Sequence, residues 1–156
     1  GDKEIVMAAL LTRGRALQFA SEELRGDHEV VMTAVKNEGL SIRYAAKQLK
    51  SDREICLSAV RQNGWSLELV DESMHGDRDL VINALTQEGQ ALKHVSDELA
   101  RDKEIVIIAV RSNAEALRGI ARELKQDPAV VNAARMGVRM RGFAGVQYFN
   151  DLLLCD

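Results

Sequence analysis

The chain has 156 residues, of which 46% are hydrophobic and only 4% aromatic, so it can bury a sizeable core and that core must be aliphatic. The formal charge of −3 at pH 7 disfavours a general attraction to nucleic acid or anionic membranes, which depends on clustered Lys and Arg. Apolar runs such as Ile105 to Val110 are far shorter than the roughly 20 residues that cross a bilayer. We therefore expect no membrane insertion.

An aspartate recurs every 25 residues, at Asp2, Asp27, Asp52, Asp77, Asp102 and Asp127. This period divides the chain into repeats 2–26, 27–51, 52–76, 77–101 and 102–126, followed by a divergent repeat 127–156 that begins "DPAVVNAARMG". Positions within a repeat are numbered as slots, with the leading Asp in slot 1. Internal repetition of this kind is typical of arrays in which each repeat packs on its neighbours.

The start of each repeat predicts an α-helix of about three turns. The slot-1 Asp is a favoured N-cap, because its carboxylate can accept hydrogen bonds from unpaired backbone N–H groups. Pro128 follows Asp127 directly, and proline is well suited to the first helical position. Slots 4, 5, 8 and 9 are apolar and form one helical stripe, which in the third repeat is Ile55, Cys56, Ala59 and Val60.

The middle of each repeat predicts a close helix crossing and then a helix end. Slot 8 is alanine in all six repeats, at Ala9, Ala34, Ala59, Ala84, Ala109 and Ala134, which favours a close approach of two backbones. Slot 13 is glycine in four repeats, at Gly14, Gly39, Gly64 and Gly89, which predicts a left-handed residue that ends the first helix.

A second apolar stripe follows slot 13 with the spacing i, i+3, i+4, i+7, as in Leu17, Ala20, Ser21 and Leu24 or Leu117, Ile120, Ala121 and Leu124. The expected fold is therefore all-α: a right-handed α-solenoid of about six 25-residue, two-helix (helix-turn-helix) repeats, forming a single domain of residues 1–156. The divergent last repeat is expected to cap the C-terminal end with Phe143, Val146, Phe149, Leu152 and Leu153.

The tripeptide Arg25-Gly26-Asp27 resembles a motif that presents an aspartate to adhesion receptors. Here it joins the last residues of one repeat to the predicted N-cap of the next, and the equivalent joints read "KSD", "HGD", "ARD" and "KQD". We interpret it as a joint between repeats, because its Asp is required for capping and short motifs match by chance.

The segments "DKEIVMAALLTRG" and "ALQFASEELRGD" resemble the repeats catalogued as domain of unknown function 4116, and the resemblance runs from Asp2 to about Gln126. It implies a tandem array of helical repeats and brings no established catalytic residues. The sixth repeat departs from the pattern, since Arg139 stands where the turn glycine is expected.

No catalytic site is predicted. The histidines His28, His75 and His94 fall in three unrelated slots, and no Ser or Cys has a base at a recognisable spacing. Cys56 stands where the other repeats carry Val and is expected to be a buried hydrophobe. We therefore expect no enzymatic activity, no metal and no cofactor.

Partner-binding residues are expected in slots whose residue type varies between repeats, while the capping and core slots keep theirs. Slot 14 holds Arg15, Leu40, Trp65, Gln90 and Glu115, and slot 18 holds Phe19, Tyr44, Leu69, His94 and Gly119. Trp65 is the strongest candidate anchor, with the alternative that it only covers the helical turn. The first repeat has no N-terminal cap, so we expect either that residues preceding Gly1 have been lost or that a partner protein covers Ile5, Val6 and Leu17, with ordinary end fraying as the alternative.

These observations favour a non-catalytic protein–protein interaction or scaffold module, including an accessory structural subunit of a larger complex. The alternative is a single-stranded RNA-binding helical repeat protein, since some repeat proteins read one base per repeat; the net charge argues against it. The compartment is not predicted beyond soluble or peripheral. Because the sequence opens on Gly1, a targeting peptide for an organelle could already have been removed.

Overall fold

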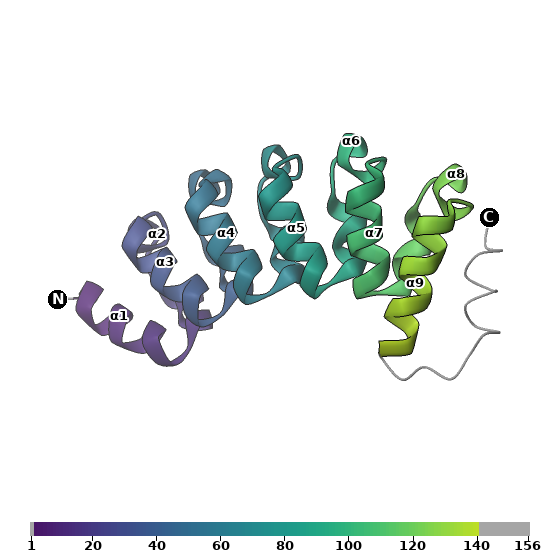
Figure 1. Cartoon of the computed structure of the whole chain (residues 1–156). Coiled ribbons are helices and arrows are strands. Elements are labelled where there is room, and N and C mark those ends of the chain that lie inside the picture. The colour runs from purple at the N-terminus through teal and green to yellow at the C-terminus, as the bar shows by residue number, and fades with distance from the viewer. Residues whose placement is uncertain (1, 141–156) are drawn as a thin grey trace. The chain divides into compact units, whose positions relative to one another are not determined.

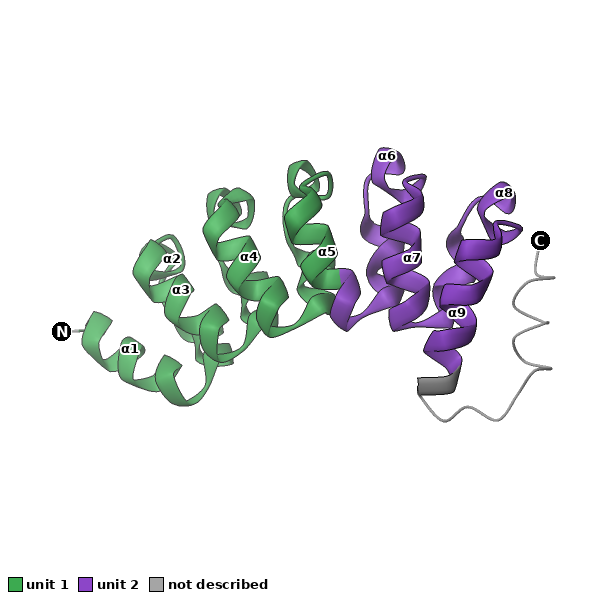
Figure 2. Cartoon of the chain, in the orientation of Figure 1, with its two compact units in different colours: residues 1–84 green, residues 85–156 purple. Residues whose placement is uncertain are grey.

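The computed structural model describes residues 2–140. The chain divides into two compact units, residues 1–84 and 85–156, each of which is described by itself (Figure 2). Within the described range every element is helical, which confirms the predicted all-α class (Figure 1). The boundary between the units falls inside a helix of the fourth repeat. A single domain and the handedness of the array stay predictions.

Each repeat begins with an α-helix, as predicted. These helices are α1 (Asp2–Thr12), α3 (His28–Asn37), α4 (Arg53–Gln62), α5 (Arg78–Gln87), α7 (Lys103–Ser112) and α9 (Pro128–Met140). In unit 1, α3 packs on both α1 and α4, and in unit 2, α7 packs on α9. Successive repeats therefore bring their first helices side by side within each unit.

The second half of each of the first five repeats differs from the predicted single helix. It is a 3-10 helix followed by a shorter helical segment. The 3-10 helices are η1 (Gly14–Phe19), η2 (Gly39–Tyr44), η4 (Gly64–Leu69), η6 (Gly89–His94) and η7 (Ala114–Gly119). The shorter segments are α2 (Glu22–Arg25), η3 (Lys47–Ser51), η5 (Glu72–Met74), α6 (Asp97–Ala100) and α8 (Arg122–Lys125).

The spacing of the buried residues explains why a 3-10 helix forms in place of the predicted α-helix. Slots 13, 16 and 19 are buried, as at Gly14, Leu17 and Ala20, and a spacing of three matches the period of a 3-10 helix. Ser21 in slot 20, which the predicted α-helical stripe included, is exposed and caps α2 by accepting from the N–H of Leu24 at 3.3 Å. The extended backbone of Ala20 separates the two segments.

The core is aliphatic and follows the repeat. Slots 4 and 5 of α3, α4, α5 and α7 are fully buried, as at Ile55 and Cys56, and so are most residues of slots 9 and 16. Cys56 is thus the small buried hydrophobe predicted. Burial of such side chains supplies the main stabilisation, roughly 25 cal/mol per Å² of apolar surface removed from water.

The sixth repeat begins like the others and then departs. Helix α9 has 13 residues, against 10 in α3, and it runs through Arg139, where the other repeats have an extended slot 12 and a 3-10 helix from slot 13. The predicted cap residues Phe143, Val146, Phe149, Leu152 and Leu153 lie outside the described residues. Among residues 2–140, no helix has the length and apolarity needed to span a membrane.

Candidate protein-binding surface

The leading Asp of the second to sixth repeats caps its helix, as predicted, whereas Asp2 is the first residue of α1 itself. The Oδ1 atom of Asp52 accepts from the N–H of Ile55 at 3.0 Å. Equivalent bonds to helix N–H groups are made by Asp27, Asp77, Asp102 and Asp127. These bonds satisfy backbone donors that the helix itself cannot pair.

The other carboxylate oxygen of the capping Asp ties it to the preceding repeat. Lys3 Nζ lies 2.8 Å from Asp27 Oδ2 and 2.9 Å from Glu29. The same slot-2 cation pairs with the next slot-1 Asp at Arg53–Asp77 (2.6 Å) and Lys103–Asp127 (2.7 Å). At the joint between the second and third repeats the slot-2 residue is His28, with Nε2 3.8 Å from Asp52.

The ion pairs with Lys3, Arg53 and Lys103 lower the pKa of Asp27, Asp77 and Asp127 and so favour their charged form. The hydrogen bond from Lys3, and then the N–H of Val30, lower the pKa of Asp27 below its usual value. The carboxylate of Arg25-Gly26-Asp27 is therefore engaged inside the fold. The carbonyl oxygen of Arg25 also accepts from the N–H of Ala46 at 2.9 Å. Both observations confirm that this tripeptide is a joint between repeats.

The slot-13 glycines serve a different purpose from the one predicted. None of Gly14, Gly39 and Gly89 has the positive φ of a left-handed residue, so that prediction is wrong for them. The reason for glycine is steric. A Cβ on Gly14 would lie 2.5 Å from the backbone oxygen of Ala34, the slot-8 residue of the next repeat. A Cβ on Gly39 would overlap the backbone oxygen of Ala59 in the same way.

A side-chain amide in slot 11 completes this joint. Asn37 accepts from the N–H of Gly14 at 2.8 Å and donates to the carbonyl oxygen of Leu11 at 2.9 Å. Gln62 accepts from the N–H of Gly39 at 2.6 Å and donates back to the carbonyl oxygen of Asn37 at 3.2 Å. This role was not predicted from the sequence, although carboxamide residues recur in slot 11 at Asn37, Gln62 and Gln87.

The variable slots lie on the 3-10 helices. Slots 14 and 17 are one turn apart in a helix with three residues per turn, so their side chains share a face. The predicted residues differ widely in exposure: Phe19 is 85% exposed and Arg15 is also exposed, whereas Leu40, Tyr44, Trp65, Leu69 and His94 are half-buried. Arg15 bonds to Glu38 of the next repeat, which makes it part of a joint.

Trp65 is the second residue of η4, and its backbone N–H donates to Oδ1 of Asn63 at 3.0 Å. The half-buried position is compatible with both interpretations given for it above. Its role as an interface anchor stays a prediction. Tyr44 lies at a hollow of about 350 Å³ that is also lined by Glu22, Arg25, Ala45 and Ala46.

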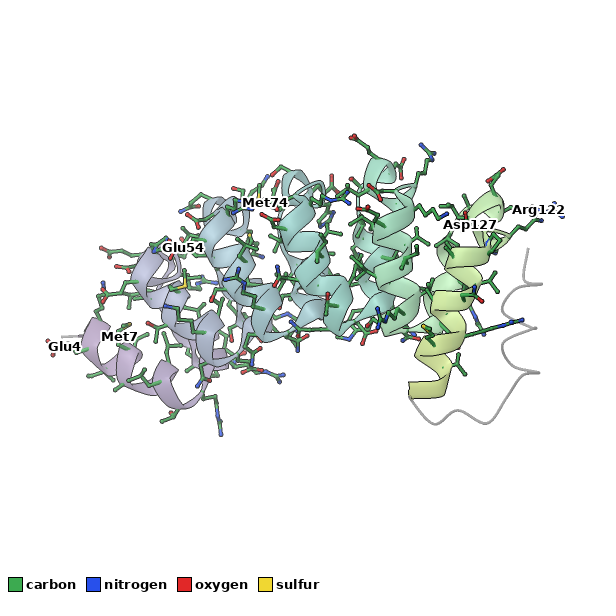
Figure 3. The ribbon with its side chains drawn as sticks, in the orientation of Figure 1. Glu4, Met7, Glu54, Met74, Arg122 and Asp127 are labelled. Carbon is green, nitrogen blue, oxygen red and sulfur yellow. The ribbon has the colours of Figure 1, made fainter. Side chains whose placement is uncertain are left out.

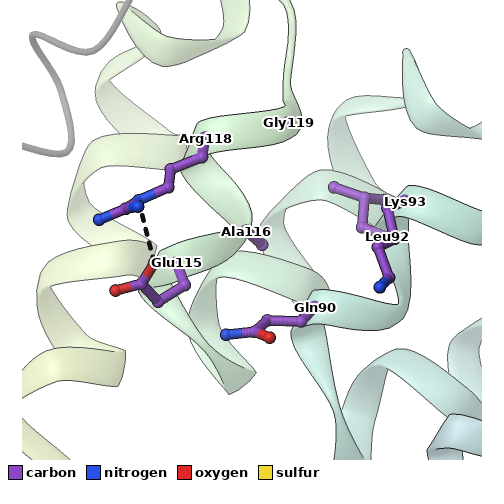
Figure 4. Close-up of a pocket in the computed structure, with 7 residues that line it drawn as sticks. All are labelled: Gln90, Leu92, Lys93, Glu115, Ala116, Arg118 and Gly119. Carbon is purple, nitrogen blue, oxygen red and sulfur yellow. Dashed lines mark ion pairs between the residues drawn. The ribbon is translucent and has the colours of Figure 1, made fainter.

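In unit 2 the variable slots of two neighbouring repeats meet at one groove, with a volume of about 370 Å³. We call it the η6–η7 groove; it is lined by Gln90, Leu92, Lys93, Glu115, Ala116, Arg118 and Gly119 (Figure 4). Slot 18 carries a side chain in the first four repeats and glycine in the fifth. No atom lies within 4 Å of the position that a Cβ on Gly119 would take.

The groove has an apolar floor and charged sides. Leu92 and Ala116 are buried at its base, while Lys93 and Arg118 are exposed slot-17 residues of neighbouring repeats. Arg118 Nε lies 3.0 Å from Oε2 of Glu115 (Figure 4). Slots 14 and 18 were predicted from their variation between repeats. Slot 17 was not predicted, although it varies between repeats in the same way.

The predicted N-terminal contact residues differ in exposure. Ile5 in α1 is 73% exposed and Val6 is half-buried, whereas Leu17 is fully buried in the core of its own repeat and is not available to a partner. Leu11 in α1 is 69% exposed. The equivalents of Ile5 in the other repeats, Val30, Ile55, Leu80, Ile105 and Val130, are all fully buried.

Cys56 and His75 both contact backbone carbonyl oxygens of the fold. Burial raises the pKa of the Cys56 thiol to about 12, and its Sγ donates to the carbonyl oxygen of Lys50. Nε2 of His75 lies 3.0 Å from the carbonyl oxygen of Leu67. In the described part of the chain, no three His, Cys, Asp or Glu side chains are grouped so as to hold a metal ion.

The recurring cap, glycine contact and ion pair define a protein built of tandem helical repeats. The family description "Domain of unknown function (DUF4116)" matches residues 2–50, 27–75 and 77–125, which together make up most of the sequence. The chain therefore belongs to the DUF4116 family, as the resemblance indicated. No curated protein and no solved structure matches it.

Proposed function

We propose that this protein is a non-catalytic protein-interaction module that binds an acidic peptide segment of a partner in the η6–η7 groove. The observation that carries the proposal is Gly119. It leaves slot 18 empty beside Lys93 and Arg118, where the earlier repeats place a side chain. A groove of about 370 Å³ is within the range that accommodates small ligands and single side chains.

The groove chemistry favours an extended peptide with an aliphatic residue next to a carboxylate. Leu92 and Ala116 supply an apolar floor for the aliphatic side chain. Lys93 and Arg118 can pair with a carboxylate, and the amide of Gln90 can both donate to and accept from a peptide backbone. Tandem repeat proteins commonly present such extended surfaces to partners.

The proposal of a non-catalytic role is supported by Cys56. A thiol is nucleophilic only as the thiolate, and the raised pKa of Cys56 keeps this one protonated at neutral pH. The ionised capping carboxylates, such as Asp27, are engaged by helix N–H groups and by cations of the preceding repeat. They support the joints between repeats.

The proposal is tested by selecting, from a library of random displayed peptides, those that bind the full chain. The affinity of the selected peptides is then measured for the wild type and for Gly119→Tyr. Tyrosine is the slot-18 residue of the second repeat, and a Cβ at Gly119 would meet no atom within 4 Å. We expect enrichment of Asp or Glu beside an aliphatic residue, and a loss of affinity of at least about tenfold in Gly119→Tyr. Gly119→Ala is the matched control and should bind as the wild type does.

One further variant and the salt dependence separate charge from shape. Arg118→Glu should weaken the selected peptides, and raising the salt concentration should weaken their binding to the wild type. Peptides that bind Gly119→Tyr as well as the wild type would overturn the proposal. Binding of single-stranded RNA, but of no peptide, would favour the RNA-binding alternative, with an affinity that falls steeply as salt rises.

A further inference from the structure

The ion pair between Glu115 and Arg118 is not a recurring feature of the repeats. The two residues occupy slots 14 and 17, and the fifth repeat alone has an acid in one of these slots and a base in the other. In the other repeats slots 14 and 17 hold Arg15 and Gln18, Leu40 and Arg43, Trp65 and Glu68, Gln90 and Lys93, and Met140 and Phe143. The joints between repeats therefore form without such a pair, although both of its residues line the η6–η7 groove.

The ion pair uses only part of each side chain. Arg118 Nε lies 3.0 Å from Glu115 Oε2 (Figure 4). A guanidinium has five N–H donors and a carboxylate has two oxygens, so the terminal nitrogens of Arg118 and Oε1 of Glu115 are left. Within residues 2–140 these remaining atoms make no further ion pair or hydrogen bond. Each side chain can therefore bind a ligand group while the pair stays intact.

Glu115 disfavours a ligand that brings only a negative charge. Its side chain is 27% exposed, against 59% for Arg118, so water screens its charge incompletely. A ligand carboxylate on Arg118 adds a like charge close to Glu115, and this repulsion weakens binding. A ligand cation on Oε1 of Glu115 removes the repulsion. The groove should therefore prefer a ligand that has both an acid and a base.

The spacing of slots 14 and 17 determines the spacing of the two ligand charges. A 3-10 helix rises about 2.0 Å per residue, so two residues three positions apart on η7 are separated by about 6 Å along the helix. In an extended peptide, residues i and i+2 lie on the same side and are about 6.6 Å apart. An acid and a base two positions apart in an extended peptide therefore match Arg118 and Glu115.

The ligand residue between the two charges matches the floor of the groove. Side chains alternate in an extended peptide, so the middle side chain points away from its two neighbours. When it packs on Leu92 and Ala116, the neighbours are directed toward the charged sides. No atom lies within 4 Å of the position of a Cβ on Gly119, so a peptide backbone can approach there.

We propose that the η6–η7 groove recognises a zwitterionic triplet, in which an acidic and a basic residue flank an aliphatic one, and that Glu115 selects the basic residue. The ligand acid binds the terminal nitrogens of Arg118, and the ligand base binds Oε1 of Glu115. This inference rests on the proposed function, because it requires a peptide in the groove. It adds a base to the acid and the aliphatic residue of that ligand.

The inference is tested with four short synthetic peptides that have blocked ends. Two contain Glu-Leu-Lys or Lys-Leu-Glu, so that both directions along the groove are sampled, and the other two have Gln in place of Lys. Affinities for the full chain are measured by NMR titration of the Gly119 amide and of the Arg118 Nε–H signal. In at least one direction, we expect the lysine peptide to bind at least about threefold more tightly than its glutamine counterpart.

Two variants with the same change in charge test the role of Glu115. In Glu115→Gln, the lysine and glutamine peptides should bind equally, because the carboxylate that receives the lysine is gone. Glutamine already occupies slot 14 of the fourth repeat as Gln90, so the fold accommodates it. Glu123→Gln changes an exposed residue of α8 that does not line the groove, and it should keep the preference for lysine.

A second pair of variants tests the acid-binding half of the groove. Arg118→Gln should weaken both the lysine and the glutamine peptides by at least about fivefold, because the ligand acid loses its charged partner. Arg122→Gln removes the same charge from an exposed residue of α8, which is labelled in Figure 3 and does not line the groove. It should bind all four peptides as the wild type does.

The possible failures separate this inference from the proposed function. Equal binding of lysine and glutamine peptides to the wild type would overturn the inference alone, and so would a preference for lysine that persists in Glu115→Gln. Absence of binding by all four peptides, while the displayed library yields acidic ligands of the groove, would also overturn it alone. If the library yields no groove ligand either, the proposed function and this inference are both wrong.

Discussion

Two joints, one in each unit, are close-packed because a side chain is absent at the contact. In one joint the earlier repeat lacks the side chain, and in the other the later repeat lacks it. Between the second and third repeats, slot 13 is Gly39, and slot 11 of the next repeat is Gln62. Between the fifth and sixth repeats, slot 13 is Ala114, and slot 11 of the next repeat is Gly137. A Cβ on Gly137 would lie 2.5 Å from the backbone oxygen of Arg111, so here α9 approaches α7 without a slot-11 side chain.

The difference between the two joints shows that the residues in slots 11 and 13 must be considered together. A side chain is present on one side of each crossing and absent on the other. Ala114 is 7% exposed and so is accommodated within the packed joint. The joint between the fifth and sixth repeats thus has alanine in place of glycine in slot 13 and glycine in place of a longer side chain in slot 11, and it stays close-packed.

The largest expected effect comes from adding a side chain where the first joint has none. Gly39→Ala should lower the free energy of unfolding by about 3 kcal/mol, because its Cβ can be accommodated only if the backbone of Ala59 moves away. Urea denaturation measures the loss. Gly119→Ala is the matched control, with an expected change within about 0.5 kcal/mol since its Cβ meets no atom. Equal losses in the two variants would refute the steric explanation.

The second prediction converts one kind of joint into the other. Gly137→Gln alone should cost about 2 kcal/mol of stability, because its side chain meets the carbonyl oxygen of Arg111. Adding Ala114→Gly recreates the arrangement of Gly39 and Gln62 and should restore at least about 1 kcal/mol. The four members of this double-mutant cycle can be compared in urea. Additive losses would show that the two slots act independently.

The sequence predicted the parts of this fold that a single residue type determines. The period of 25, the Asp caps and the buried slots 4, 5 and 9 followed from Asp27, Ile55 and their equivalents, because capping and burial constrain residue identity strongly. The 3-10 helix was missed. Leu17 and Ala20 fit both an α-helical stripe and a period of three, and only the exposed Ser21 distinguishes the two.

The candidate surface was only partly predictable. Variation between repeats pointed to slots 14 and 18, and Gln90, Glu115 and Gly119 do line one groove. That a groove exists depends on the space left around Gly119, which is a property of packing and not of residue type. The steric role of Gly39 was missed for the same reason, since the clash partner belongs to another repeat.

The third prediction concerns how much the side-chain amide in slot 11 contributes to stability. The joint at Gly137 lacks this amide. Gln62→Met should cost about 1 kcal/mol, because it leaves the N–H of Gly39 without its acceptor while keeping side-chain bulk. Amide exchange of Gly39 should become faster. Gln18→Met, at an exposed position of η1, is the control and should change stability little. An unchanged exchange rate at Gly39 would show that the hydrogen bond does not protect this amide.

The smallest expected effect comes from removing the slot-1 carboxylate that faces a cation at each of the two joints. Lys103 pairs with Asp127 at 2.7 Å, whereas at the other joint His28 lies 3.8 Å from Asp52 and is a cation only when protonated. Asp127→Asn keeps a good N-cap but removes the ion pair, so it should lower the urea midpoint at pH 7 slightly more than Asp52→Asn does.

The pH dependence of Asp127→Asn has a definite sign. The hydrogen bond from Lys103, followed by the N–H of Ala129, lowers the pKa of Asp127 in the folded protein. The stabilisation is therefore present above the pKa of an unfolded Asp, about 4, and is lost as the pH falls through the lower folded value. The difference between wild type and Asp127→Asn should shrink steadily as the pH is lowered from 5 to 2. A difference that stays constant over this range would mean that charge contributes nothing to the joint and that the cap alone stabilises it.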